Sequence, residues 1–238
     1  MTSDRDPVVS PGKDRPSDPL VPGWKELARR MVEQLDGEDA QVLAAMAEVP
    51  RHRFVPPRWR SQAYQDTPLP VGPNATISAP HMVALQLGYA RLAPGLKVLE
   101  VGSGSGYLLA VIERLVRPGG QVFGLEIEPE LAARSRATLS EVGEGLARVR
   151  QVEGSQGWAE VSPFDRVLVS FAVQGPLPAA WGEQTAQGGY LLAPWGSGGA
   201  LHLERWRKVD GVLVRDRHGP PCLFVSGKTA PTVDGSTS

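Results

Sequence analysis

Three glycines separated by single residues, Gly102, Gly104 and Gly106, stand between a short apolar run and a helix-like segment. Glycines at a strand-to-helix junction permit a tight turn and let a ligand approach the main chain closely. The start of the following helix offers unpaired N–H groups to acceptor atoms of that ligand. A plain strand–turn–helix junction has the same glycines, so this pattern alone favours a ligand site only weakly.

Two glutamates stand where they would flank such a ligand. Glu100 comes just before the glycines, and Glu126 lies 20 residues beyond Gly106, at the end of the next apolar run. An acidic residue at the second place is suited to hold the hydroxyl groups of a ribose. A carboxylate at the first place would repel a pyrophosphate and attract a cation. The pair therefore favours a cationic nucleoside without phosphates, such as S-adenosylmethionine, over NAD.

Short apolar runs alternate with helix-like segments around this loop, and glycine or proline separates most of them. The expected strands are residues 97–101, 121–126, 149–152, 166–170 and 190–193. The expected helices are residues 107–116, 129–142 and 177–184. Repeated strand–helix units predict an α/β fold, Rossmann-like and doubly wound, with a mostly parallel sheet and helices on both faces. An antiparallel hairpin turning at Asp210 and Gly211, and a strand at 223–225, should complete the sheet.

The residues before position 97 do not show this alternation of strands and helices. Apolar spacing predicts helices at residues 24–35, 41–49 and 81–90. The proline-rich stretch 51–80 shows no sustained period and is interpreted as irregular; a loop of that length is often functional. We expect one domain at residues 23–228. Its first part, 23–94, is a helical and irregular extension on the substrate side, and its second part, 95–228, is a cofactor-binding core. The tails at 1–22 and 229–238 are expected to be disordered.

Composition excludes several classes of protein. The 238 residues hold 25 Lys and Arg against 26 Asp and Glu, a balance unlike that of nucleic-acid-binding domains, which are usually basic. Cys222 is the one cysteine, so neither an intrachain disulfide nor a cysteine-based zinc site is expected, and no metal is predicted. No apolar run reaches the roughly 18 residues of a membrane span. We expect a cytoplasmic monomer without nucleic-acid or membrane partners.

Three further stretches carry a specific pattern: VPRHRFVP at 49–56, AYQDTPLPVG at 63–72 and ATISAPHMVA at 75–84. Together with the glycine loop they resemble the protein-L-isoaspartate O-methyltransferase family, which belongs to the class I S-adenosylmethionine-dependent methyltransferases. The Thr-Ile-Ser-x-Pro element at 76–80 beside such a loop is quite specific to that family. The resemblance covers roughly residues 24–225, most of the chain.

This resemblance implies an activity and a set of site residues. The expected reaction transfers a methyl group from S-adenosylmethionine to the free carboxylate of an L-isoaspartyl residue in a damaged protein or peptide. The ester then cyclises to a succinimide, whose hydrolysis returns some normal aspartate. Ser78 corresponds to the family's active-site serine and would position the carboxylate by a hydrogen bond. The candidate cofactor contacts are Thr76, Ile77, Glu100, Gly102, Ser103, Gly104, Glu126, Ile127, Glu153 and Gly154.

The chain departs from the family pattern at two places. Glu153 stands where the family usually has aspartate, which keeps the charge on a longer side chain. Residues 223–227 read LFVSG where the family often has a Val-Pro-Leu element, so no substrate contact is assigned there.

Alternative interpretations exist for the residues and for the whole chain. Ser78 followed by Ala79-Pro80 also suits a helix N-cap, His81 suits a structural role, and Asp66 suits a turn. The same scaffold also suits a methyltransferase dedicated to the ordinary aspartates of one peptide, which would drive succinimide formation. A non-catalytic S-adenosylmethionine-binding module is a further alternative. Nucleic-acid methylation is disfavoured because no Asn/Asp-Pro-Pro-aromatic motif follows the fourth strand.

Overall fold

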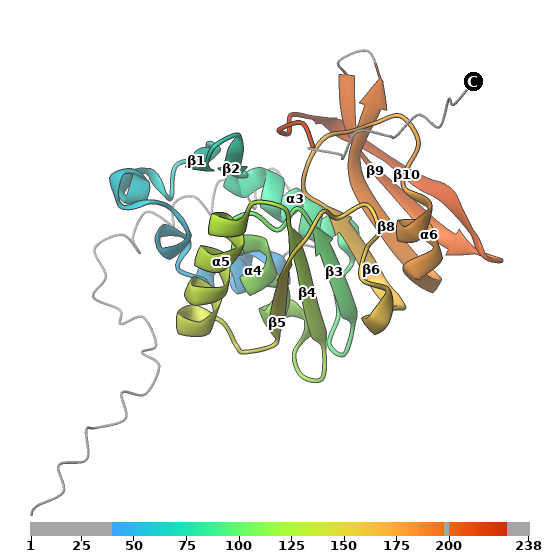
Figure 1. Ribbon diagram of the computed structural model, residues 1–238, viewed down its shortest axis with the longest axis horizontal. Coiled ribbons are helices and arrows are strands. Elements are labelled where there is room, and N and C mark those ends of the chain that lie inside the picture. Colours follow the sequence, from blue (N-terminus) through green and yellow to red (C-terminus); the bar gives the residue numbers. More distant parts are fainter. Residues whose placement is uncertain (1–39, 198–199, 228–238) are drawn as a thin grey trace, which may run out of the picture.

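The computed structural model describes residues 40–197 and 200–227 (Figure 1). The expected tails and the helix expected at 24–35 fall outside the described residues. In the central eight-stranded sheet seven strands follow the order β10–β9–β8–β6–β3–β4–β5, and the short strand β7 pairs with β8. The strands are β3 (Lys97–Val101), β4 (Gln121–Glu126), β5 (Ala147–Gln151), β6 (Phe164–Val169), β7 (Val173–Gln174), β8 (Thr185–Ser197), β9 (Ala200–Val209) and β10 (Val212–Cys222).

The sheet is mostly parallel, as the sequence predicts. Strands β8, β6, β3, β4 and β5 are parallel to one another, whereas β9 is antiparallel to both of its neighbours. The expected hairpin joins β9 to β10, with Val209 opposite Val212. Its turn residues Asp210 and Gly211 both have positive φ, at 48° and 84°, as a two-residue hairpin turn with matching twist requires.

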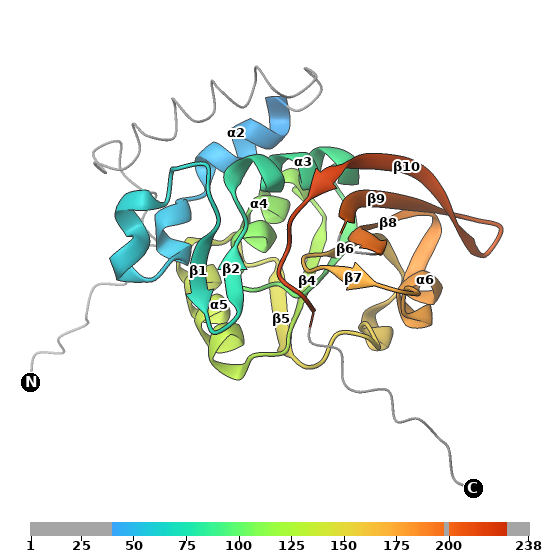
Figure 2. The ribbon, with the colours of Figure 1, turned by 90° about the horizontal axis from the view of Figure 1, so that it is seen from above.

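Helices cover both faces of the sheet (Figure 2). On one face lie α2 (Ala40–Glu48), α3 (Pro80–Ala90), α4 (Tyr107–Val116) and α5 (Pro129–Val142). On the other lie the 3-10 turn η3 (Ala159–Val161) and α6 (Ala179–Gln184). Val98 packs under the first group and its neighbour Leu99 packs toward Trp181 of α6. Because the central strands are buried on both faces, they read as continuous apolar runs in the sequence.

The direction of winding reverses beside β3. The chain moves outward from β3 through β4 to β5, with α4 and α5 on one face, and then returns to β6 on the other side of β3. In doubly wound sheets the crevice at such a reversal, beyond the carboxyl ends of the strands, is the place where ligands bind. Here the carboxyl ends of β3 and β6 carry the glycine loop and Ser170–Phe171.

Several elements have the bounds that the sequence predicts, and others differ. β3, α4, β4 and α5 match the expected ranges. The expected strand at 190–193 is the middle of the much longer β8, which continues through Gly188 and Gly189. The strand expected at 223–225 is wrong, because that stretch forms no ladder; an isolated bridge joins Ala172 to Ser226 instead.

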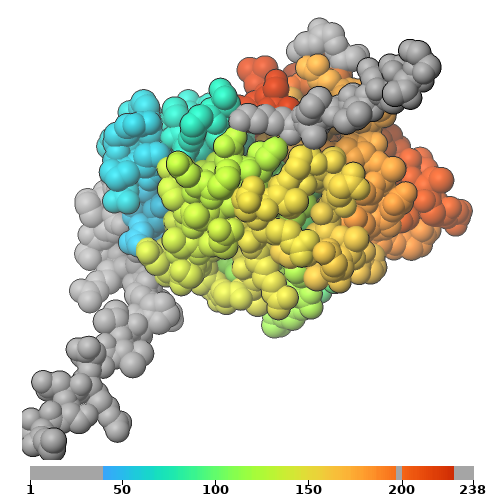
Figure 3. Space-filling view, viewed as in Figure 1, coloured from blue at the N-terminus to red at the C-terminus, as the bar shows by residue number. Residues whose placement is uncertain are grey.

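The proline-rich stretch is more ordered than expected. It forms two 3-10 helices, η1 (Arg51–Phe54) and η2 (Pro57–Gln62), followed by a hairpin of β1 (Leu69–Gly72) and β2 (Ala75–Ile77). Asn74 turns the hairpin with a φ of 55°, a conformation that asparagine tolerates well. In the space-filling view this segment, in cyan and teal, lies against α5 in yellow-green (Figure 3). An ion pair between Arg53 and Glu141 joins the two.

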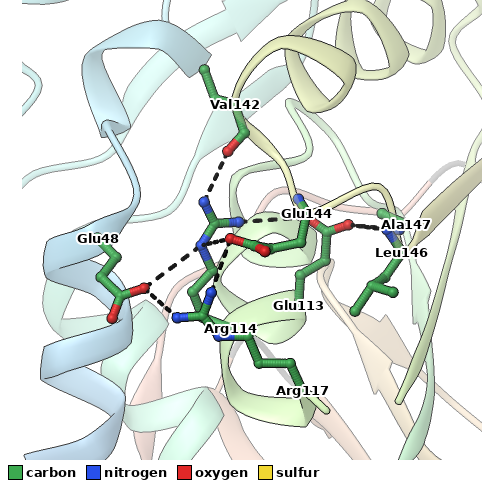
Figure 4. A network of polar contacts seen from close by, with 8 residues as sticks. All are labelled: Glu48, Glu113, Arg114, Arg117, Val142, Glu144, Leu146 and Ala147. Carbon is green, nitrogen blue, oxygen red and sulfur yellow. Dashed lines mark hydrogen bonds and ion pairs between the residues drawn. The ribbon is translucent and has the colours of Figure 1, made fainter. Parts of the chain in front are cut away.

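The buried carboxylate of Glu113 stabilises the end of the sheet that lies away from the glycine loop (Figure 4). Glu113, near the end of α4, is fully buried and accepts hydrogen bonds from the main-chain N–H groups of Glu144, Leu146 and Ala147. These residues connect α5 to β5. The carboxylate therefore fixes this connection from inside the fold, on the side away from the glycine loop.

Candidate active site

The glycine loop is tied to the end of β4. The N–H groups of Gly102 and Ser103 both donate to the carbonyl of Leu125, at 2.8 and 2.9 Å. Gly102 has a φ of 80°, and a Cβ on it would lie 2.6 Å from the ring of Phe171. Glycine is therefore required at this position both by the backbone conformation and by the space available.

Glu126 connects this loop to the start of α5. One carboxylate oxygen accepts from the N–H of Gly104 at 2.7 Å, and the other accepts from the N–H of Glu128 at 2.9 Å. A carboxylate has about four acceptor sites, so these two bonds leave capacity for the hydroxyl groups of a ligand.

A first cavity opens above the loop, between the strand ends and the β1–β2 hairpin. Its lining includes seven of the residues that the sequence proposes as cofactor contacts: Thr76, Gly102, Gly104, Glu126, Ile127, Glu153 and Gly154. The carboxylate of Glu153 accepts two hydrogen bonds from the N–H of Ser155, at 3.0 Å each, and one from its hydroxyl. The cavity thus combines a glycine cradle with three glutamates, Glu126, Glu128 and Glu153, a set of groups that suits a nucleoside without phosphates.

Three other proposed contacts lie behind this cavity. Ile77, Glu100 and Ser103 are all buried and are not among its lining residues. Ile77 packs in the core beneath the hairpin. These buried side chains lie next to residues that line the cavity, and their contact with a cofactor stays a prediction.

A second cavity, of about 710 Å³, adjoins the first. Thr76, Ser170 and Val225 line both, so the two cavities meet at these residues. The polar side chains of the second cavity are Thr76, Ser78, His81 and Ser170. Its remaining lining is apolar: Pro68, Ala79, Met82, Ala200, Leu201, Pro221, Cys222, Leu223, Phe224 and Val225.

Ser78 is not a helix cap. The N-cap of α3 is Ala79, and no side chain of that residue caps the helix. Asp66 supplies an acceptor instead, because one of its carboxylate oxygens accepts from the N–H of His81 at 3.0 Å and contacts its Nδ1 at 2.9 Å. The capping interpretation of Ser78 is therefore wrong, and its hydroxyl forms no hydrogen bond with any residue in the described parts of the chain.

Comparison with known proteins places this arrangement in a family. The family model for protein-L-isoaspartate(D-aspartate) O-methyltransferase matches residues 25–229. The chain belongs to this family. Protein-L-isoaspartate O-methyltransferase 2 of Anaeromyxobacter sp. is 49% identical over 83% of this chain and 81% of its own length. The Aeropyrum pernix protein-L-isoaspartate O-methyltransferase is 42% identical over 85% of this chain and 79% of its own length.

Solved structures of the family have the same fold. One protein-L-isoaspartate O-methyltransferase superposes with a TM-score of 0.78 at 25% identity, covering 87% of this chain and 66% of that chain. A protein-L-isoaspartate O-methyltransferase from Plasmodium falciparum, solved with S-adenosyl-L-homocysteine, gives a TM-score of 0.74 at 27% identity. That match covers 89% of this chain and 99% of the other. The Rossmann-like methyltransferase fold expected from the sequence is thereby confirmed.

Glu100 has an unusual environment for a residue of this methyltransferase site. It is 2% exposed, and its Oε1 accepts a hydrogen bond of 2.7 Å from the hydroxyl of Ser170. Its other oxygen is buried without a hydrogen-bond partner. Burial, helped by nearby Glu126, raises the pKa of Glu100 to about 8 despite the hydrogen bond from Ser170. The carboxyl is thus largely protonated at neutral pH, and a bound cation would favour its ionised form.

The segment after β10, residues 223–227, forms a strap across the methyltransferase site. Figure 2 shows it running between the β1–β2 hairpin and β7. The N–H of Ala172 donates to the carbonyl of Val225 at 2.8 Å, and Gly227 packs against the ring of Phe171. Leu223 and Phe224 line the second cavity, and Ser226 and Gly227 line the first.

Sequence reasoning assigned no role to several residues that line the site. Ser170 and Phe171 were not proposed, because both are far in sequence from the glycine loop, and no contact was assigned in the strap, because its sequence departs from the family pattern. Gly227 leaves space for the ring of Phe171, so this glycine could have indicated a close contact there. No local sequence pattern connects the two residues, however.

Two further findings concern membranes and metals. None of the helices in the described parts of the chain has both the length and the apolar run that a membrane crossing requires. Within residues 40–197 and 200–227, no group of three or more His, Cys, Asp or Glu side chains is arranged to hold a metal ion.

Proposed function

We propose that this chain methylates the free carboxylate of L-isoaspartyl residues in damaged proteins or peptides, with S-adenosylmethionine as its cofactor. The observation that carries the proposal is the pair of adjoining cavities. One has the glycine loop and carboxylates for a nucleoside, and the other has Ser78 among apolar side chains. The family match over residues 25–229 supports the same activity.

The residues of the first cavity fit the cofactor. Gly102 and Gly104 line the cavity with main chain that a ligand can approach closely, and Glu126 retains acceptor sites for its ribose hydroxyls. Ile127, Glu153 and Gly154 would surround the adenine, and Thr76 would lie at the junction with the second cavity. When bound, S-adenosylmethionine supplies an electrophilic methyl group on a positively charged sulfur.

The residues of the second cavity would bind and orient the substrate. A carboxylate is already ionised at neutral pH, so the reaction requires no general base. The Ser78 hydroxyl, which has no partner in the described parts of the chain, would donate a hydrogen bond to the substrate carboxylate. The apolar walls would exclude water from the reacting groups. Holding two reactants in a near-attack arrangement contributes as much as about 7–11 kcal/mol to lowering a barrier.

A pair of matched peptides tests this function. The purified full-length protein is incubated with methyl-labelled S-adenosylmethionine and a peptide that carries either L-isoaspartate or normal aspartate at one position. We expect label on the isoaspartyl peptide, and at least about tenfold less on the matched aspartyl peptide. In isoaspartate the main chain continues through the side-chain carboxyl group and leaves the α-carboxylate free, whereas in aspartate the α-carboxyl group is part of the peptide bond. Equal labelling of both peptides would contradict the proposed specificity.

Other outcomes of this assay identify the alternatives. Labelling of an ordinary aspartate in one particular peptide, with none on isoaspartyl peptides, would indicate a dedicated peptide methyltransferase. Saturable binding of S-adenosylhomocysteine without labelling of any carboxylate would indicate a binding module. The expectations of a monomer, of a cytoplasmic location and of no nucleic-acid or membrane partner stay predictions. Sedimentation of the full-length protein would test the first of them.

A further inference from the structure

One buried arginine has no part in the chemistry described above. Arg51, in η1, is 0% exposed, and a buried charge is costly unless its donors find acceptors. Its Nε donates to the carbonyl of Ala63 at 2.8 Å, and its Nη2 donates to the carbonyl of Ser78 at 2.7 Å. The ring of Tyr107 lies against the guanidinium, with 5.0 Å between its centroid and Cζ. No carboxylate among residues 40–197 and 200–227 forms an ion pair with Arg51.

The guanidinium keeps its charge in this place. Burial lowers the pKa of Arg51 to about 10, and interactions with Tyr107 partly oppose the shift. The side chain is therefore still protonated at neutral pH. Its two hydrogen bonds to carbonyl groups are charge-assisted and hence stronger than bonds between neutral partners. Apart from the Tyr107 side chain, the hydrogen-bond partners of this buried charge are main-chain carbonyls, which indicates that the positions of those carbonyls matter.

The bond to Ser78 restrains a residue that has few other restraints. Ser78 lies in the two-residue link between β2 and α3, and its hydroxyl caps no helix. The carbonyl and the side chain of Ser78 share one Cα atom, so a shift of the carbonyl also moves the hydroxyl. The bond from Arg51 thus restrains the main chain that carries the hydroxyl of Ser78, a residue in the lining of the second cavity.

The bond to Ala63 restrains the loop that contacts His81, a residue in the lining of the second cavity. Ala63 precedes Tyr64, whose hydroxyl lies 2.9 Å from Nδ1 of His52. Asp66 follows two residues later and holds the main-chain N–H and the ring of His81. One side chain therefore links the loop that holds His81 to the main chain of Ser78.

We propose that Arg51 is the positioning residue for Ser78, and that it sets the alignment of the substrate carboxylate with the methyl donor. This inference rests on the proposed function. A misplacement of about 1 Å in a reacting group lowers rates by roughly 100-fold, so a small shift at Ser78 is enough for a measurable loss.

A double-mutant cycle tests the coupling. Arg51→Lys keeps a positive charge and loses the fork that reaches both carbonyls, whereas Arg51→Met removes the charge at similar length. Each is measured alone and combined with Ser78→Ala, with kcat and KM determined on the isoaspartyl peptide. We expect Arg51→Lys to lower kcat/KM by about tenfold or more when Ser78 is present, and by less than about threefold when it is absent. The affinity for S-adenosylhomocysteine should stay within about twofold, since Arg51 does not line the first cavity.

The chain offers a matched control at the other end of α3. Arg166 donates to the carbonyls of Ala90 and Arg91, at 2.6 and 2.9 Å, and lies 4.6 Å from the centroid of the Tyr190 ring. Arg166→Met should lower the unfolding temperature without any coupling to Ser78→Ala. Equal losses from the Arg51 variants in both backgrounds would overturn the proposal, and so would wild-type activity in both of them.

A readout without substrate separates this inference from the proposed function. Hydrogen–deuterium exchange of the Arg51→Lys protein should be faster than in the wild type at residues 63–66 and 78–82, and unchanged at 102–106. If the wild type methylates no isoaspartyl peptide, the proposed function fails, and the exchange pattern still decides the positioning role. Unchanged exchange at 78–82 would overturn that role, whatever the activity. If Arg51→Met does not fold, Arg51→Lys decides both measurements.

Discussion

At the scale of the residue, Ser78 shows how position rather than reactivity can define a functional group. Its hydroxyl has neither a base nor a capping partner in the described parts of the chain, yet it lies in the lining of the second cavity beside Thr76, which borders both cavities. A carboxylate substrate needs a donor that holds it in place, and a serine hydroxyl is sufficient for that task.

Replacing Ser78 by alanine should therefore separate turnover from cofactor binding. We expect kcat/KM on the isoaspartyl peptide to fall by about 10- to 100-fold, because one hydrogen bond that aligns the reacting carboxylate is lost. The affinity for S-adenosylhomocysteine, measured by calorimetry, should change by less than about twofold, since Ser78 does not line the first cavity. Ser162→Ala, at the far edge of the fold, is the control. Unchanged turnover would remove Ser78 from the site.

Glu100 makes stability depend on pH. Its pKa is about 8 in the folded protein, against an ordinary value of 4.5, because burial disfavours the charged form. Between these two pH values the folded state keeps a proton that the unfolded state releases. The contribution of Glu100 to the free energy of unfolding is therefore fully present below about pH 4.5. It is then lost as pH rises toward 8, by at most about 1.4 kcal/mol per pH unit.

Glu100→Gln should remove this dependence. The glutamine oxygen can still accept the hydrogen bond from Ser170, so the local packing is largely kept. We expect the unfolding free energy of the wild type, relative to the variant, to decrease between pH 5 and pH 8, as measured by urea unfolding at a series of pH values. Glu160→Gln, at an exposed position, should leave the wild-type slope in place. Parallel curves for the wild type and Glu100→Gln would contradict the shifted pKa.

At the scale of the element, the sequence predicted best where glycine and proline mark both ends. The helix Pro129–Val142 begins at a proline and ends before a glycine, and its bounds matched. β8 was underestimated because Gly188 and Gly189 look like a break, whereas the strand passes through Gly188 at a φ of 77°. The wrong strand at 223–225 has an apolar, extended sequence. Whether such a segment joins a ladder depends on neighbours that the local sequence does not contain.

The glycine loop allows a prediction that separates backbone strain from steric overlap. At Gly102 an alanine would meet a φ of 80°, which costs roughly 1–2 kcal/mol, and would also overlap the ring of Phe171. We expect Gly102→Ala to weaken S-adenosylhomocysteine binding by more than about tenfold, because the loop must shift toward the cavity to relieve both.

Phe171→Ala should restore part of this loss. It removes the overlapping ring and leaves the backbone strain, so the double variant should bind more tightly than Gly102→Ala alone and more weakly than Phe171→Ala alone. Calorimetry on the three variants and the wild type measures the coupling. Simple additivity of the two substitutions would show that the ring and the loop do not interact.

At the scale of the whole molecule, only those site residues that lie close together in the sequence could be predicted from its local patterns. The glycine loop and Glu126 belong to one strand–helix–strand unit, so a motif within 25 residues located them. Arg51 and the strap lie roughly 50 and 120 residues from the loop in sequence, and only the fold brings them to one edge of the sheet. Ser78 was found through its resemblance to a family motif, since nothing in its own neighbourhood distinguishes a substrate-binding serine from a helix cap.

The two ends of the sheet have separate tasks, because the ligand cavities lie at one end and the Glu113 network lies at the other. Glu113 is 0% exposed and is ion-paired with Arg114, in addition to its three bonds from the main chain between α5 and β5. Hydrogen bonds to a buried charge are among the stronger ones, at about 1.5–3 kcal/mol each.

Glu113→Gln should therefore destabilise the whole fold and spare the site. An amide has one acceptor oxygen where the carboxylate has two, so at least one main-chain donor is left unpaired, and its NH₂ group faces another donor. We expect the free energy of unfolding in urea to fall by about 2–4 kcal/mol, with an unchanged affinity for S-adenosylhomocysteine in the folded protein. Glu144→Gln, at a position 36% exposed, should cost less than about 1 kcal/mol. Weakened cofactor binding in folded Glu113→Gln would show that the two ends of the sheet are coupled, contrary to this separation.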